Sequence, residues 1–132
     1  MSAADEGGVG RRAAEWLLVR HAPVADRTRL FGRHDAPCSI PDGVVLDRLR
    51  SALGEFDRLV ASPAMRCRET ARMLFPQHES RTDERLWEQD FGQWEARPFA
   101  CLPDLGPLPP EILCERAPPG GDWELRDAVV QG

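Results

Sequence analysis

A short, uninterrupted apolar run near the start of the chain limits the folds open to it: Trp-Leu-Leu-Val at residues 16–19. Continuous runs of this kind are typical of strands covered on both faces, as in parallel sheets. The run ends abruptly at Arg20 and His21. Parallel sheets present their ligands at the carboxyl ends of the strands, so these two side chains are predicted to lie at a functional edge.

Helices and strands are predicted to alternate after this run. A loop is predicted up to Pro41. Asp42 then caps a predicted helix that stops at Gly54. Apolar residues recur along this helix at helical spacing, namely Val45, Leu46, Leu49, Ala52 and Leu53. A strand over residues 56–61 is followed by a helix that Ser62 caps, with Pro63 in its first turn, ending near Phe75. Residues 85–87 are predicted as a third strand, and residues 98–120 as loop with a helical turn or two at 111–115. This order predicts an α/β fold with a mainly parallel sheet.

The length of 132 residues predicts one domain, over residues 15–132, behind a flexible segment over residues 1–14. A net charge of −5 argues against nucleic-acid and anionic-membrane partners. No apolar signal segment or membrane span is visible, so the cytoplasm is the predicted location. The four cysteines form no C-x-x-C pair, which argues against a zinc cluster. All 17 basic residues are arginine, which reflects either genome composition or a use for phosphate binding through paired hydrogen bonds.

A second polar group follows the second predicted strand. Ser62 begins a helix whose free N–H groups and positive end point to the same crevice as His21. Arg66 lies within the first turn or so of that helix, in reach of an anion at the helix mouth, whereas Arg68 and Arg72 are interpreted as part of a solvated face. Taken alone, His21 is also compatible with a histidine that only caps a strand end.

Three ordered blocks between residues 16 and 96 resemble the histidine phosphatase superfamily, branch 1, whose members are phosphoglycerate mutase-like. Arg-His-Ala-Pro at residues 20–23 is similar to the family's Arg-His-Gly block, although Ala22 replaces the glycine and Arg27 stands where many members have asparagine. Residues 62–71 match Ser-x-Leu-x-Arg-Ala-x-x-Thr-Ala at its fixed Ser, Arg, Thr and Ala. Residues 86–96 match Leu-x-Glu, a spacer and Gly-x-Trp-Glu. The Arg-His-Ala-Pro variant resembles small bacterial phosphatases such as alpha-ribazole phosphatase.

The resemblance implies a three-layer α/β fold, with helices on both faces of the sheet, and a phosphomonoester hydrolase that acts on a small phosphorylated metabolite. It implies His21 as the nucleophile that becomes phosphohistidine and Glu88 as the proton donor, for which the alternative is a strand-end carboxylate without a role. Arg20 and Arg66 would bind the phosphoryl oxygens, with no metal or cofactor. The loop similar to the family's substrate loop supplies Phe31, Gly32 and Arg33.

Chemistry adds one expectation: the His21 ring nitrogen that does not attack should be held as a donor by a backbone carbonyl. The family's second histidine, in a Val-x-x-His-Gly block, has no match, since His34 and His78 are the only other histidines. We therefore expect a C-terminally truncated domain that is poorly active and marginally stable. The alternatives are a catalytically impaired remnant that binds phosphorylated ligands or partners, and an unrelated α/β binding domain. Substrate identity and oligomeric state stay open.

Overall fold

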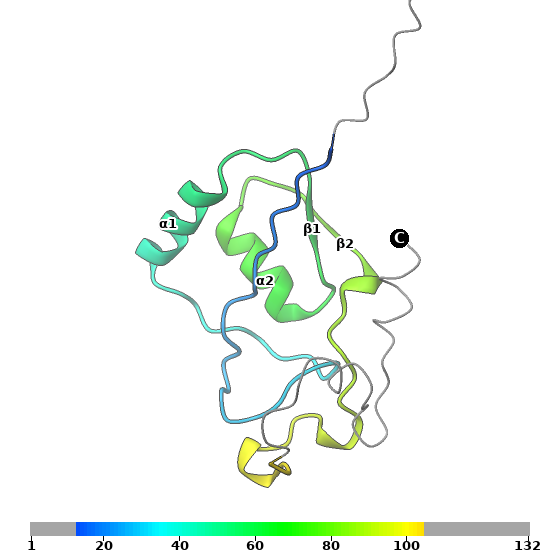
Figure 1. The fold of residues 1–132 in the computed structure, drawn as a ribbon. Coiled ribbons are helices and arrows are strands. Elements are labelled where there is room, and N and C mark those ends of the chain that lie inside the picture. Colours follow the sequence, from blue (N-terminus) through cyan, green and yellow to red (C-terminus); the bar gives the residue numbers. More distant parts are fainter. Residues whose placement is uncertain (1–12, 105–132) are drawn as a thin grey trace, which may run out of the picture.

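The computed structural model describes residues 13–104, with two helices and two short strands (Figure 1). Helix α1 spans Gly43–Leu53, strand β1 Leu59–Ala61, helix α2 Met65–Leu74 and strand β2 Ser80–Thr82. The strands pair in parallel, with Leu59 opposite Ser80 and Ala61 opposite Thr82, and α2 packs on both. The α/β class and the parallel pairing are therefore confirmed. The predicted turn at 111–115 lies outside the described residues.

Helix α1 forms where its end signals predict it. The Asp42 carboxylate accepts a hydrogen bond from the Val44 amide at 2.8 Å, and Gly54 follows the last turn with φ 65°, a left-handed value that favours glycine. Arg50 joins α1 to α2, because its guanidinium donates to the Met73 carbonyl at 2.6 Å and to the Leu74 carbonyl at 2.5 Å. These carbonyls belong to the last turn of α2, where an arginine satisfies acceptors that the helix leaves open.

Helix α2 begins at Met65, later than the predicted cap at Ser62. The Ser62 hydroxyl accepts from the Ala64 amide at 3.3 Å, and Ala64 takes the cap position without a side-chain hydrogen bond. The acceptor for the Met65 amide comes from a distant loop, since the Asp35 carboxylate lies 2.7 Å from it. A tertiary contact thus replaces the local cap that the sequence predicts.

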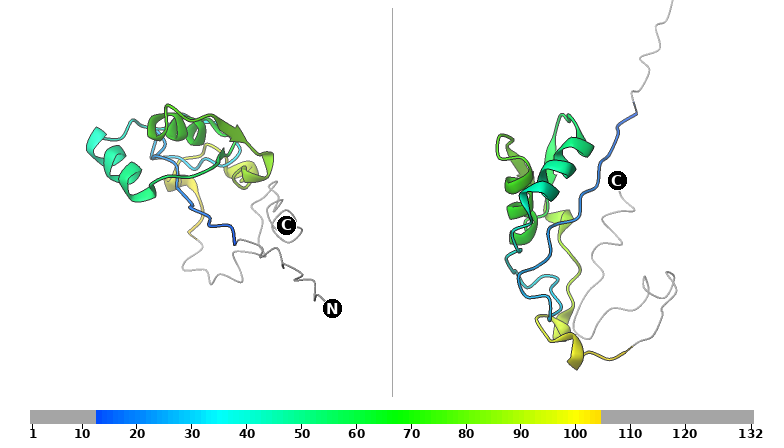
Figure 2. Two further views of the ribbon diagram at one scale, coloured as in Figure 1. Left: turned by 90° about the horizontal axis from the view of Figure 1, so that it is seen from above. Right: turned by 90° about the vertical axis from the view of Figure 1, so that its left-hand side faces the viewer.

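The strand predicted at residues 16–19 is not formed. Figure 2 shows this segment, in dark blue, as an extended run leading away from the two helices. Trp16 is 78% exposed and Leu18 is 92% exposed. An apolar run becomes a buried strand only where neighbouring strands accept its hydrogen bonds. Within residues 13–104 the strands pair only as β1 with β2, so the run has no ladder partner there.

The third strand predicted at residues 85–87 is also wrong. The chain forms a single 3₁₀ turn at Glu84–Leu86, and the strand that pairs with β1 lies earlier, at β2. The Asp83 side chain accepts from the Arg85 amide at 3.0 Å and from the Arg85 guanidinium at 2.7 Å. Short side-chain bonds of this kind favour a tight turn over a strand. The same hydrogen bonds lower the pKa of Asp83 to about 2.

A loop layer lies beside the helices and strands, at the bottom of Figure 1. The Leu30 amide donates to the Arg97 carbonyl at 3.0 Å, and the Ala96 amide returns a bond of 2.8 Å to Leu30. The Phe99 amide donates to Thr28 at 2.9 Å, next to 3₁₀ turns at Gly92–Trp94 and Phe99–Cys101. Two loops almost seventy residues apart in sequence are thereby fixed to each other. Within the described part of the chain, neither helix is long and apolar enough to cross a bilayer.

Candidate functional site

Arg66 is a charged side chain enclosed by the fold. It projects from the first turn of α2 and is only 2% exposed. Its Nη2 donates to the Gly32 carbonyl at 3.0 Å, whereas its buried Nη1 has no hydrogen-bond partner within residues 13–104. A buried donor without an acceptor is costly, and more so when it is charged. An anion placed at Nη1 would satisfy it, and the guanidinium fork suits phosphate oxygens.

His21 is held by the backbone next to it. Its Nδ1 lies 2.6 Å from the carbonyl oxygen of Ala22. A carbonyl can only accept, so Nδ1 carries the proton and the neutral ring keeps its lone pair on Nε2. The expectation that a backbone carbonyl fixes the second ring nitrogen is confirmed. In this tautomer Nε2 is the nitrogen of the half-buried ring whose lone pair is available.

Thr70 connects the histidine turn to the arginine turn. Its hydroxyl accepts a hydrogen bond from the Ala22 amide at 2.8 Å and donates to the Arg66 carbonyl at 2.7 Å. Thr70 is buried, four residues beyond Arg66 on the same face of α2. The structure therefore brings together two sequence blocks that contain His21 and Arg66, through a single buried hydroxyl.

Gly32 comes so close to the third block that only glycine fits. A Cβ atom there would collide with the Gln89 carbonyl oxygen and lie 2.7 Å from a carboxylate oxygen of Glu95. That carboxylate also accepts from the backbone amides of Gly32, Arg33, His34 and Phe91, at 3.1, 2.7, 3.1 and 3.1 Å. Sequence reasoning missed Glu95 as a site residue, because nothing local to it points to partners more than sixty residues earlier.

Glu88 lies at the edge of the same loop layer, with an exposed side chain whose carboxylate accepts from the Gln89 amide at 2.9 Å. Arg33 contacts the Glu88 backbone, donating from Nε to its carbonyl at 2.9 Å, and places its guanidinium 5.7 Å from the centroid of the Trp87 ring. Burial raises the pKa of the Cys67 thiol, the Arg66 charge lowers it, and the Glu88 charge raises it.

No hydrogen bond within residues 13–104 joins the remaining candidates, Arg20 and Phe31, to Arg66. Arg20 is exposed, and no hydrogen bond or ion pair joins it to another of the described residues. The Phe31 ring stacks on His34 at 5.9 Å between centroids, so the substrate-like loop carries an aromatic pair. His78 packs against Phe56 at 4.7 Å and Phe75 at 5.8 Å, beside α1.

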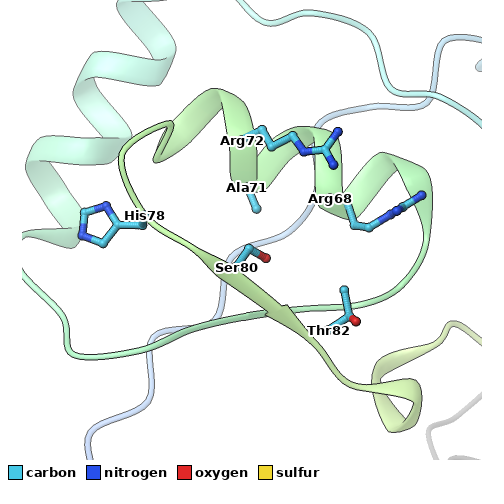
Figure 3. Close-up of a pocket in the computed structure, with 6 residues that line it drawn as sticks. All are labelled: Arg68, Ala71, Arg72, His78, Ser80 and Thr82. Atoms are coloured by element: carbon cyan, nitrogen blue, oxygen red, sulfur yellow. The ribbon is translucent and has the colours of Figure 1, made fainter.

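Arg68 and Arg72 are exposed and face away from Arg66. They line a shallow cavity of about 150 Å³ between α2 and β2, shown in Figure 3, together with Ala71, His78, Ser80 and Thr82. No group of three metal-ligating side chains gathers anywhere in residues 13–104. The enclosed cation of this helix is Arg66 alone, since Arg68 and Arg72 remain on the solvent side.

The chain is similar to several solved structures. It is 23% identical to the mycobacterial glucosyl-3-phosphoglycerate phosphatase, covering 84% of this chain and 59% of that one, with a TM-score of 0.62. A protein of Thermus thermophilus is 27% identical, over 86% and 67% of the two chains, with a TM-score of 0.62. For Bacillus stearothermophilus YhfR the identity is 26%, the coverage 61% and 43%, and the TM-score 0.54. This chain thus spans less than two thirds of the mycobacterial protein.

No curated protein is similar enough in sequence to count as a match. The family model described as the histidine phosphatase superfamily (branch 1) matches residues 16–122. That range includes the His21 turn, the buried Arg66 and the loop layer around Glu95. On this match, which covers most of the sequence, the chain belongs to the histidine phosphatase superfamily, branch 1.

Proposed function

We propose that this protein hydrolyses phosphate monoesters of small metabolites through a phosphohistidine at His21. The observation that carries the proposal is the buried Arg66 guanidinium, which is anchored on one side by the Gly32 carbonyl and has an unpaired donor at Nη1. A phosphoryl oxygen is the partner that this donor suits best. Thr70 ties the same turn to His21, whose Nε2 is the nucleophilic nitrogen.

The proposed reaction has two steps. Nε2 of His21 attacks phosphorus, the ester P–O bond breaks, and the leaving alcohol takes a proton from Glu88. Water then attacks the phosphohistidine and gives a proton to Glu88, the P–N bond breaks, and inorganic phosphate leaves. Arg66 and Arg20 bind the phosphoryl oxygens and stabilise the charge that develops on them. Each proton transfer of this type is typically worth about 10²–10⁴-fold in rate.

The loop beside this site supports a proposal for the substrate class. Phe31 and Arg33 supply an aromatic ring and a cation beside the organic part of the ester, and Gly32 between them holds the loop against Arg66. The mycobacterial relative carries the name glucosyl-3-phosphoglycerate phosphatase, which denotes a small phosphorylated metabolite as its substrate. We propose a substrate of similar size and charge for this chain.

A second candidate function is phosphate binding without turnover. The sequence has three histidines, and His34 and His78 contact aromatic rings rather than Arg66. In a protein that lacks a donor opposite the nucleophile, the rate typically falls by about 10²–10³. Binding through Arg66 does not depend on that donor, so it would survive where turnover does not.

The test is to trap phosphate from radiolabelled 3-phosphoglycerate on the full chain. We expect an acid-labile, base-stable label on the peptide that contains His21, and no label on the His21→Ala variant. Turnover that is unchanged in His21→Ala would overturn the proposed enzyme. Phosphate binding without any label or turnover would leave the binding function in its place.

A further inference from the structure

Glu95 is the most heavily used acceptor in the loop layer. Its two carboxylate oxygens accept from four backbone amides, three of them consecutive, at Gly32, Arg33 and His34. Three consecutive amides that converge on one carboxylate form an anion-binding concavity. Here the anion is the Glu95 carboxylate, so the hydrogen bonds of these amides hold the loop over residues 32–34 in place and do not bind a separate ligand.

The loop that Glu95 holds is the one that contacts Arg66. Gly32 donates its amide to Glu95 and offers its carbonyl to Nη2 of Arg66. This hydrogen bond ties the guanidinium to the Gly32 carbonyl, so a shift of that carbonyl would move Nη1 with it. The loop approaches Glu95 so closely that a Cβ on Gly32 would collide with its carboxylate, so any side chain at this position would push the loop away from it.

We propose that Glu95 is a positioning residue that sets the anion affinity of Arg66 through the backbone of residues 32–34. The proposal rests on the proposed phosphate site at Arg66. Glu95 does not touch the phosphoryl group; its carboxylate orients the carbonyl that orients the guanidinium. Outer partners of this type change ligand affinity by about 10–100-fold in metal sites, and we expect an effect in the lower part of that range.

Glu95→Gln is the sharpest variant, because it keeps the shape and removes one acceptor. The amide NH₂ would face backbone N–H groups and cannot accept from them. We expect inorganic phosphate, measured by calorimetry on the full chain, to bind about tenfold more weakly. Asp42→Ala is the matched control: it removes a carboxylate that accepts one backbone amide far from the loop, and phosphate affinity should not change.

A double-variant cycle separates positioning from general loosening of the fold. If Glu95 acts through Arg66, the Arg66→Ala, Glu95→Gln pair binds phosphate no more weakly than Arg66→Ala alone. If the two losses multiply, Glu95 acts independently of Arg66 and the proposal is wrong. The proposal would also be wrong if Glu95→Gln bound phosphate as tightly as the parent chain while Arg66→Ala bound it more weakly. That result would leave the phosphate site at Arg66 in place.

Hydrogen exchange on the unmodified chain provides a test that needs no folded Glu95 variant. Phosphate should slow exchange of the Arg33 and His34 amides, and should have no such effect in Arg66→Ala. Equal slowing in both proteins would mean that the loop senses phosphate without Arg66, against the proposal. If Arg66→Ala binds phosphate as tightly as the parent chain, Arg66 does not form the phosphate site. The proposed role of Glu95 is then wrong as well.

Discussion

Helix α2 has two faces that carry the same type of side chain in opposite settings. Arg66 is enclosed, with one donor fixed on Gly32 and another that has no partner among residues 13–104, while Arg68 and Arg72 lie in solvent on the outer side. All three are arginines within seven residues. The difference shows that the position in the turn, and the loop that closes over it, decide whether an arginine of this helix is enclosed or solvated.

Helical spacing explains why the inner face is separate. Arg66, Thr70 and Leu74 follow one another at four-residue steps and are all buried, whereas Arg68 and Arg72 are offset by half a turn. Glu69 lies on the same helix, and its carboxylate accepts a hydrogen bond from the Cys38 amide at 2.8 Å. This bond lowers the pKa of Glu69, and the charges of Arg72 and Arg68 lower it further by smaller amounts. The outer arginines are exposed, so water solvates their charge and they do not require an added anion.

Thr70→Val should produce the larger effect on stability. The substitution leaves the buried Ala22 amide without its acceptor, which typically costs about 1–3 kcal/mol. Denaturant unfolding of the full chain measures the change. Thr82→Val makes the same chemical change at an exposed position on β2 and should cost far less. Equal losses of unfolding free energy in the two variants would mean that the buried hydroxyl of Thr70 stabilises the fold no more than an exposed hydroxyl does.

Arg68→Ala and Arg72→Ala should have the smallest effect. Exposed substitutions that break no buried contact usually stay within about 0.5 kcal/mol. The same unfolding measurement checks both variants. A loss well above this value at either position would show that the cavity between α2 and β2 contributes to the fold, and would weaken the contrast between the faces.

The sequence predicted best what is decided locally. Helix α1 has its cap at Asp42 and its stop at Gly54 as predicted, because both signals act within a few residues. The strand before Ser62 was also predicted, although it is shorter, at Leu59–Ala61. The start of α2 was placed too early, since its first amide is satisfied by Asp35 from another loop. The apolar run at 16–19 lacks a partner strand among the described residues, which no local pattern could reveal.

Within the candidate site, the sequence predicted the setting of Arg66 and the carbonyl that holds His21, but not the residues that support them. The turn position of Arg66 set it apart from its neighbours, and chemistry required the carbonyl that holds His21. The hydroxyl of Thr70 and the carboxylate of Glu95 act across 48 and more than 60 residues. Contacts of that range depend on how the loops fold together, so the residues that make them resemble ordinary polar positions in the sequence.

The most direct test of this account is the affinity of the full chain for inorganic phosphate, compared with Arg66→Ala and Arg72→Ala. Losing a charged hydrogen bond of about 1.5–3 kcal/mol predicts binding about 10–150-fold weaker in Arg66→Ala. Arg72→Ala should bind like the parent chain. Circular dichroism on each variant verifies that it is folded. Equal affinities in all three proteins would contradict the claim that the enclosed arginine is the phosphate-binding group.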